Sequence, residues 1–291
     1  MNFQLEITSF CDLECRECPN HAMKRKRAMM TREVWDTILR DYVVPFRHVN
    51  ASGAPTLIPD KDGEPLLNKK ILEYLKAASD LLPDLKFSIY THGLRLNTDI
   101  LAFLGSLPNR TQLMVTFHFY NHDGSLNDYT KTDALLRSWL SRPKLGPENI
   151  DFVLASHLVA PMTLGRLQDW KASWKSFEDA GRVKVHANTL ISPWTGLMKD
   201  VATCSFFECP YQHFDHMFFG ATGNVIACCM DLEEEIVFGN VLKDDPQVMF
   251  EKVRDFYAAQ KRHEPSYEVC NDCFGLPPRQ KQELLQLGVG K

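Results

Sequence analysis

The nine cysteines of this chain fall into two groups, one near each end of the sequence. Three of them, Cys11, Cys15 and Cys18, lie in the stretch CDLECRECPN, directly after an apolar, β-rich run. No further cysteine occurs before Cys204. The remaining five are Cys209, Cys228, Cys229, Cys270 and Cys273. Cysteines that only fill a core would not be separated in this way, so the distribution predicts metal binding at both ends of the chain.

The composition is that of a folded globular protein. Hydrophobic residues make up 44% and charged residues 24% of the 291 positions, which is enough to bury a sizeable core. The start, MNFQLEITSF, lacks the pattern of a signal peptide, and no run of about 18 apolar residues occurs. We therefore expect a cytosolic (cytoplasmic) protein with no membrane partner and no disulfide framework. A net charge of −4 argues against a nucleic-acid partner.

Short apolar runs alternate with helix-like segments up to about residue 190. The predicted strands are 3–8, 55–58, 85–90, 112–119, 150–156 and 183–188. The predicted helices are 31–42, 68–81, 98–106, 131–140 and 165–179, with Thr31, Asn68, Thr98 and Thr163 as their start residues. This alternation predicts an α/β fold with a parallel sheet. Beyond residue 195 we expect a hairpin over 216–229, turning at Gly220 and Gly223, and helices near 246–261 and 278–287.

Polar residues gather at or just after the ends of the predicted strands. Parallel sheets place their sites at the carboxyl ends of the strands, so these residues are candidates for one site. The residues concerned are Cys11, Asp62, Gly63, Glu64, Thr91, His92, His118, His157 and His186. A single histidine in such a position is more often a satisfied buried residue, and only the shared position favours a functional role.

The first cysteine group has the spacing C-x3-C-x2-C. Three thiolates on one compact loop suit a [4Fe–4S] cube, in which three irons take protein sulfur and the fourth iron stays open. A structural zinc site usually has four ligands, and His21 is the only further local candidate. The spacing therefore favours an iron–sulfur cluster, with zinc as the alternative.

The stretch CDLECRECP resembles the defining motif of the radical S-adenosylmethionine (SAM) enzymes, and DGEP, residues 62–65, looks like their GGEP motif. The resemblance covers about residues 3–190 and implies a partial (β/α)6 barrel. It implies that the first three cysteines hold a [4Fe–4S] cluster whose open iron binds SAM. Glu64 and the turn at Gly63 would hold the SAM amino group, because an ammonium needs anionic or carbonyl acceptors. Cleavage of SAM would yield methionine and a 5′-deoxyadenosyl radical, which abstracts a substrate hydrogen.

Two residues depart from the family pattern, and both bear on contacts with SAM. Glu17 replaces an aromatic residue that packs near adenine, and Asp62 replaces the first glycine of GGEP. Thr91 begins a THG run where the family often has Thr-Asn-Gly, and His118 is a candidate contact of the ribose or the substrate. The basic run KRKR, residues 24–27, is expected to be a solvated loop.

The later cysteines are similar to the C-terminal extension called SPASM, or to its shorter form, twitch. The similarity lies in Cys209, in G-x4-C from Gly223 on the predicted hairpin, and in the final C-x2-C. Only 18 residues follow the last cysteine and none is cysteine, so the resemblance implies a twitch extension with one auxiliary [4Fe–4S] cluster. Its ligands would be Cys209, Cys228, Cys270 and Cys273. By themselves, these four thiolates suit zinc equally well.

These resemblances imply a radical SAM barrel over 1–195 and a twitch-like auxiliary-cluster domain over 196–291. The short chain with one auxiliary cluster resembles the aminocyclitol dehydrogenase group. We therefore expect an oxidoreductase that acts on a small polar substrate (a sugar, aminocyclitol or nucleoside-like molecule), with a flavodoxin- or ferredoxin-like electron donor. The sequence identifies no catalytic base. Candidate pocket residues are Tyr120, His157, His186, Asn188 and Trp194.

Three alternatives stay open. An epimerase would quench the substrate radical with a thiol, for which Cys229 or Cys204 could serve, although packed hydrophobic thiols are the commoner case. A second alternative is a peptide- or nucleotide-modifying radical SAM enzyme. The third is an iron–sulfur protein that has lost SAM chemistry, as the changes at Glu17 and Asp62 would allow.

Overall fold

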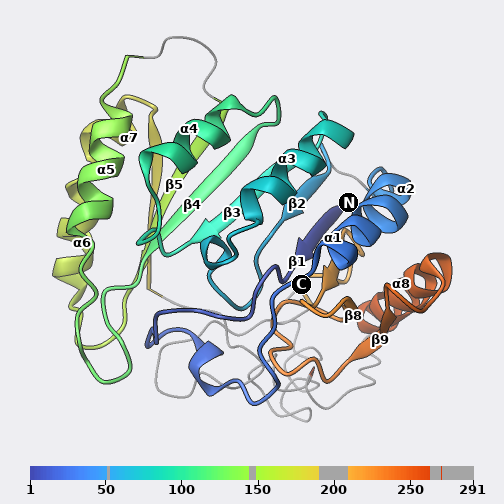
Figure 1. Ribbon diagram of the computed structural model, residues 1–291. Helices are drawn as coiled ribbons and strands as arrows, with labels where there is room; N and C mark the ends of the chain where they lie inside the picture. Colours follow the sequence, from blue (N-terminus) through green and yellow to red (C-terminus); the bar gives the residue numbers. More distant parts are fainter. Residues whose placement is uncertain (51–52, 144–148, 190–208, 263–269, 271–291) are drawn as a thin grey trace.

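The computed structural model describes residues 1–50, 53–143, 149–189, 209–262 and 270, and its centre is one nine-stranded sheet (Figure 1). The strand order is β6-β5-β4-β3-β2-β1-β7-β8-β9. The first six strands are β1 (Asn2–Leu5), β2 (Thr56–Ile58), β3 (Lys86–Thr91), β4 (Thr111–Phe117), β5 (Ile150–His157) and β6 (Val183–Asn188). Neighbours among these six all pair in parallel and follow chain order. The predicted parallel α/β sheet is confirmed.

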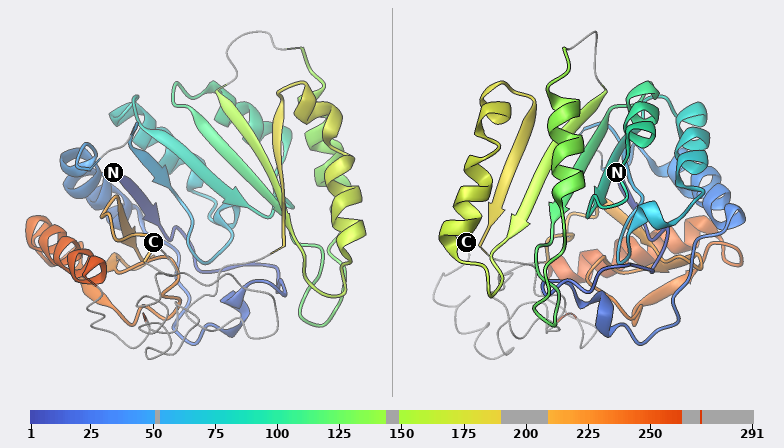
Figure 2. Two further views of the ribbon diagram at one scale, coloured as in Figure 1. Left: turned by 180° about the vertical axis from the view of Figure 1, so that it is seen from behind. Right: turned by 60° about the vertical axis from the view of Figure 1, so that its left-hand side comes forward.

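Helices follow the parallel strands and cover the sheet. They are α1 (Arg32–Ile38), α2 (Val44–Phe46), α3 (Ile71–Leu81), α4 (Thr98–Ser106), α5 (Thr130–Leu140), α6 (Leu164–Ala172), α7 (Lys175–Asp179) and, near the C-terminus, α8 (Pro246–Lys261). A π-helical turn, Leu39–Val43, joins α1 to α2. Figure 1 shows α3 and α4 in front of the strands, and the reverse view in Figure 2 shows the strands in front. The sheet is open, as in the partial barrel that the family resemblance implied.

Helix starts follow local capping chemistry, and three of the four predicted starts are confirmed. Thr31 and Thr163 each accept a backbone hydrogen bond three residues later through their hydroxyl groups. Helix α4 begins at Thr98, as predicted, and the side chain that caps it is the preceding Asn97, which accepts a hydrogen bond from Ile100 N. Asn68 does not cap α3, because its amide bridges Ile7 O and Lys70 N and fixes the preceding turn.

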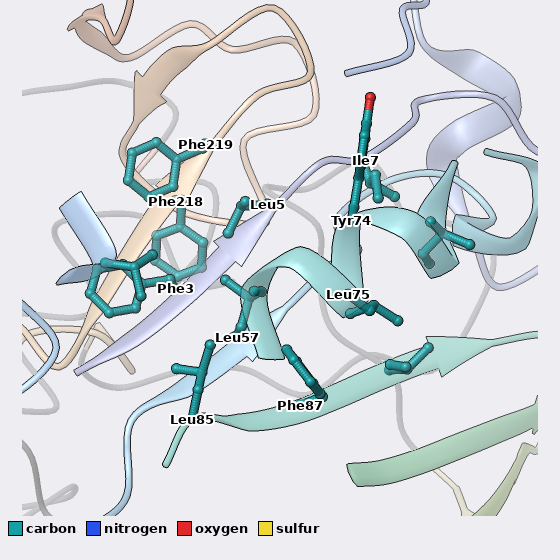
Figure 3. Close-up of a cluster of buried hydrophobic side chains, with 14 of the residues drawn as sticks. Phe3, Leu5, Ile7, Leu57, Tyr74, Leu75, Leu85, Phe87, Phe218 and Phe219 are labelled. Carbon is teal, nitrogen blue, oxygen red and sulfur yellow. The ribbon is translucent and has the colours of Figure 1, made fainter. Parts of the chain in front are cut away.

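The core lies between the sheet and its helices. Along β1 exposed fractions alternate, because successive side chains point to opposite faces. Phe3 and Leu5 have no exposed surface, and they belong to one buried cluster with side chains of the helices and the neighbouring strands (Figure 3). This packing fixes the strand from which the first cysteine loop departs.

The C-terminal segment continues the same sheet on the far side of β1. Strand β7 (His216–Phe219) pairs in parallel with β1, and β8 (Asn224–Ile226) and β9 (Val237–Asn240) add antiparallel strands. The predicted hairpin is confirmed, and Gly223 at its turn has a φ of +87°, a conformation that suits glycine. The predicted helix at 246–261 is α8. The predicted domain boundary at 195 and the helix near 278–287 lie outside the described residues.

Candidate active site

A cavity of about 240 Å³ lies at the carboxyl ends of β1 to β5. It is lined by Cys11, Cys15, Glu17, Cys18, Asp60, Lys61, Asp62, Gly63, Glu64, Tyr90, Thr91, His92, Thr116, His118 and His157. The parallel topology explains this gathering, because each strand delivers its next residues to the same edge. All nine residues predicted for the first cluster and for SAM contacts line this cavity.

The three cysteines of the first group share this cavity. Burial raises the pKa of Cys15 well above its usual range and that of Cys18 to about 12, so both thiols are protonated until a metal displaces the proton. Among the described residues, the sulfur atoms of these three cysteines are not all within 4.8 Å of one another. Ligand atoms that bind a single ion lie within that distance of each other. This wider arrangement suits a cluster better than a single zinc ion.

Glu64 is held in place by three donors. Its Oε1 accepts hydrogen bonds from Thr91 Oγ1 at 2.7 Å and Leu66 N at 3.0 Å, and its Oε2 accepts one from His92 N at 3.0 Å. The His92 imidazole also faces this carboxylate, with Nε2 3.3 Å from Oε2, so Glu64 is surrounded by protein donors. The side chain is therefore oriented at the cavity wall before any ligand arrives.

Gly63 lets the turn after β2 approach the turn after β1. A Cβ atom at this position would overlap the carbonyl oxygens of Thr8 and Phe10. The close approach is fixed by a hydrogen bond of 2.9 Å from Glu64 N to Phe10 O. No other residue type fits here without displacing backbone, so glycine is required for the geometry of the DGEP turn.

Asp62 belongs to a buried ion network. Arg25 Nη2 lies 2.9 Å from its Oδ2, and Lys61 Nζ contacts the same oxygen. Burial raises the pKa of Asp62 to about 7, and the two cations oppose that effect. Arg25 also pairs with Glu6 and Glu234. The carboxylate of Asp62 is thus occupied by protein cations, and its assignment to SAM stays a prediction.

This network corrects the expectation that residues 24–27 form a wholly solvated loop. Lys24 and Lys26 are exposed, but Arg25 and Arg27 turn inward. Arg27 donates to Ser9 O and to Asn20 Oδ1, each at 2.6 Å, and so clamps the cysteine loop. The run alternates between solvent and protein because successive side chains of an extended segment point to opposite sides.

Glu17 pairs with a histidine rather than facing solvent. His118 Nδ1 lies 2.7 Å from Glu17 Oε1, and the glutamate side chain is 3% exposed. Burial opposes the ionisation of Glu17, but the contact with His118 outweighs it and lowers the pKa. The ring of His157 stacks with that of His118 at a centroid distance of 6.0 Å. Burial and the nearby His118 lower the pKa of His157 to about 4, so it is neutral at physiological pH.

The second cysteine group lies between the β7–β8 hairpin and α8. Cys209 and Cys228 are close enough to Tyr257 of α8 to contribute to raising its pKa, after burial. Gln260, one turn further along α8, lies 3.8 Å from Cys270 Sγ. Three of the four predicted auxiliary ligands therefore adjoin one face of α8, and the fourth, Cys273, lies outside the described residues.

Cys229 has different neighbours from the adjacent Cys228. Its sulfur is 2.9 Å from Tyr211 Oη, and Asp60 and Lys61 of the cavity wall are near enough to affect its pKa. Burial raises that pKa to about 11, against the hydrogen bond from Tyr211. Cys229 thus lies near both the second cysteine group and the cavity wall, and because β8 ends at Ile226, the predicted strand alternation does not extend to it.

Several candidate residues are placed elsewhere. His186 is exposed on β6, and Tyr120 is buried with its hydroxyl 3.3 Å from Arg166 Nη1; neither lines the cavity. Trp194 and Cys204 lie outside the described residues. Asp60, Lys61, Tyr90 and Thr116 line the cavity but were not predicted. Their positions at strand ends were the available signal.

Comparisons with known proteins agree with this geometry. Residues 209–274 match the SPASM family, described as an iron–sulfur cluster-binding domain. A crystal structure of BtrN in complex with AdoMet and 2-DOIA aligns with a TM-score of 0.61 at 17% identity, over 94% of this chain and 90% of that chain. The resemblance to radical SAM enzymes with a SPASM-type extension is confirmed.

A second relative shares the fold. Native anSMEcpe with bound AdoMet aligns with a TM-score of 0.61 at 15% identity, over 94% of this chain and 86% of that chain. The same protein with AdoMet and the Cp18Cys peptide aligns with a TM-score of 0.59, also at 15% identity, over 93% and 85% of the two chains. No curated protein sequence matches the chain. Among the described residues, no helix is both long and apolar enough to cross a membrane.

Proposed function

We propose that this chain is a radical SAM oxidoreductase that oxidises a small polar substrate. The observation that carries the proposal is one cavity, lined by the three cysteines of C-x3-C-x2-C and by the Gly63–Glu64 turn. These are the two groups that would hold a SAM-binding [4Fe–4S] cluster and the SAM amino group. BtrN and anSMEcpe, which have the same fold, are both found with AdoMet.

The residues present fit such a cluster. Cys11, Cys15 and Cys18 supply three thiols from one loop, and all three line the cavity. A cube ligated by three thiolates keeps one iron open for an exogenous ligand. When bound with SAM, the cluster would supply one electron to cleave it to methionine and a 5′-deoxyadenosyl radical that removes a substrate hydrogen atom.

The chain's own contribution is to bind and orient. Glu64, fixed by Thr91 and by the backbone of Leu66 and His92, would supply the anionic partner of the SAM ammonium at the cavity wall. Gly63 exposes backbone beside it, and Thr91 holds the carboxylate from the end of β3. Glu17, Asp62 and His118 complete the wall, with Asp62 acting through the ion network that fixes the turn.

The second cysteine group completes the oxidation. Cys209, Cys228 and Cys270, with Cys273, would hold an auxiliary [4Fe–4S] cluster that can accept the second electron of an alcohol oxidation. The alcohol would lose a hydrogen atom from carbon and a proton from oxygen, and the auxiliary cluster, when bound, would supply the acceptor for the electron left on the substrate. A flavodoxin- or ferredoxin-like protein would supply the first electron.

The cluster content tests the architecture. Anaerobically reconstituted protein should carry about eight cluster irons per chain, with about as many sulfides, if both clusters form. Cys228→Ala should lower this to about four, while Cys229→Ala should leave it unchanged. About four irons in the wild-type protein would contradict the auxiliary cluster.

A second candidate, an epimerase, is favoured by the position of Cys229 between Tyr211 and the cavity wall. Turnover of a panel of aminocyclitols and aminosugars in deuterated water separates the two. An oxidation yields a ketone that has lost two hydrogens. A thiol-quenched epimerisation yields an isomer that has gained one solvent deuterium, and Cys229→Ala should abolish it. Products with deuterium and no net oxidation would contradict the oxidoreductase.

A further inference from the structure

Three side chains from separate parts of the chain converge on the cavity. Glu17 comes from the cysteine loop, His118 follows β4, and His157 ends β5. One donor atom of each lies within 4.8 Å of the others, and all three are buried or half-buried. We propose that Glu17, His118 and His157 bind one divalent transition-metal ion, Fe²⁺, separate from both iron–sulfur clusters.

Unsatisfied polar atoms point to a ligand at this place. Glu17 Oε2 and His157 Nδ1 are buried and have no hydrogen-bond partner. The Glu17 side chain is 3% exposed, so water does not reach this oxygen freely. Buried polar atoms are nearly always paired, and a bound ion is one of the few things that explains an exception. The ion would satisfy both atoms at once.

The donor set suits iron. Two imidazoles and one carboxylate, with further positions open, form the facial arrangement typical of mononuclear Fe²⁺ sites. In the structure His118 Nδ1 and Glu17 Oε1 are 2.7 Å apart, close enough for both atoms to bind the same ion.

Asn188 is placed to orient the His157 ring. His157 Nε2 lies 3.3 Å from Asn188 Nδ2, and with the Asn188 amide turned over, Oδ1 would accept a hydrogen bond from Nε2–H and leave Nδ1 for the ion. Metal-bound histidines usually make such a contact through their second nitrogen, and it fixes the ring. Asn188 is thus a positioning residue.

The chemistry of the site also indicates what it would take from solution. Glu17, His118 and His157 all line the cavity, so hard oxygen or amine donors of a molecule in the cavity would fill the remaining coordination positions of the ion. A substrate with a hydroxyl and an adjacent hydroxyl or amine would bind through two atoms and be held with a chosen carbon toward the reacting centre. Binding of Fe²⁺ needs no SAM cleavage, so this inference and the proposed function can fail separately.

The test labels the ion alone. Both clusters are assembled with the Mössbauer-silent isotope of iron, Fe²⁺ of the Mössbauer-active isotope is added anaerobically, and unbound ion is removed by gel filtration. We expect a high-spin ferrous signal of about one ion per chain, distinct from the cluster signal. His157→Gln should lose the signal, and Asn188→Ala should weaken binding about 10–100-fold.

A control variant comes from another histidine pair. His21 and His122 lie with ring centroids 3.6 Å apart at the surface, so His122→Gln should retain the ion. Total iron and sulfide, with circular dichroism, show whether each variant is folded and carries its clusters. No ferrous signal in the wild-type protein would overturn the site and leave Glu17–His118 as a hydrogen-bonded pair. Equal signals in wild type and folded His157→Gln would overturn it too.

Discussion

Glu64 and Thr91 are joined across the cavity wall by a hydrogen bond of 2.7 Å, from the Thr91 hydroxyl to Glu64 Oε1. The bond links the turn after β2 to the end of β3. It orients the carboxylate that we assign to the SAM ammonium, so binding of SAM depends on a contact between the turn after one strand and the end of the next.

Glu64→Gln should weaken SAM binding to the cluster-loaded protein by about 10–100-fold, because a hydrogen bond to a charged group is worth about 1.5–3 kcal/mol. Thr91→Val keeps the charge and removes only the orienting hydroxyl, so it should cost about tenfold or less. Equilibrium dialysis with labelled SAM measures both. Wild-type affinity in Glu64→Gln would contradict the assignment.

Arg25→Met should lower the free energy of unfolding by about 3–5 kcal/mol, because it leaves the buried carboxylates of Glu6, Asp62 and Glu234 without their shared cation. The matched control is Arg32→Met, which breaks exposed pairs with Asp36 and Glu73 and should leave the free energy of unfolding nearly unchanged. Urea unfolding compares the two variants. If the two variants lose the same free energy of unfolding, the buried ion network around Arg25 stabilises the fold no more than an exposed ion pair does.

Gly63→Ala should destabilise the protein by about 1–3 kcal/mol and impair SAM binding, because the added methyl group would push the DGEP turn off Thr8 and Phe10. Gly105→Ala in α4 is the control. There the nearest atom to an added Cβ is Ile150 Cδ1 at 3.7 Å, and the change should stabilise the helix by about 0.5–1 kcal/mol. If Gly63→Ala keeps wild-type stability and SAM affinity, the close packing of Gly63 against the Thr8 and Phe10 carbonyl groups is not required.

Cys229 should react slowly with iodoacetamide in the cluster-loaded protein. Burial raises its pKa to about 11, so at pH 8 the reactive thiolate is rarer than in a free cysteine, by a factor on the order of 100. The rate should keep rising with pH up to pH 10 without levelling off. Peptide mapping after short labelling pulses gives this profile. A plateau near pH 9 would place the thiol in solvent.

The parallel sheet was predictable because each strand carries its own signal. Runs such as 85–90 and 150–156 are apolar, β-rich and bounded by helix-like segments, and they became β3 and β5. The exact start of each helix was harder to predict, because it depends on a single capping side chain. Asn97 and Thr98 are both good caps, and sequence alone does not decide which one takes the non-helical conformation that Asn97 has here.

The motif residues were predictable, but their partners were not. The cysteines, Gly63 and Glu64 were found because motif spacing is local. Glu17 and His118 are 101 positions apart, and their pairing arises only when the cysteine loop folds against the end of β4. The inward turn of Arg25 depends likewise on carboxylates brought near by the sheet. Long-range polar pairs of this kind leave no periodic trace in a single sequence.

The most direct measurement of the central claim is the release of 5′-deoxyadenosine from SAM by the anaerobically reconstituted, chemically reduced protein. The account predicts that 5′-deoxyadenosine and methionine appear in equal amounts and that Cys15→Ala abolishes both. If wild-type protein with its full iron and sulfide content binds SAM and releases no 5′-deoxyadenosine, the chain is an iron–sulfur protein without SAM chemistry, and the claim is contradicted.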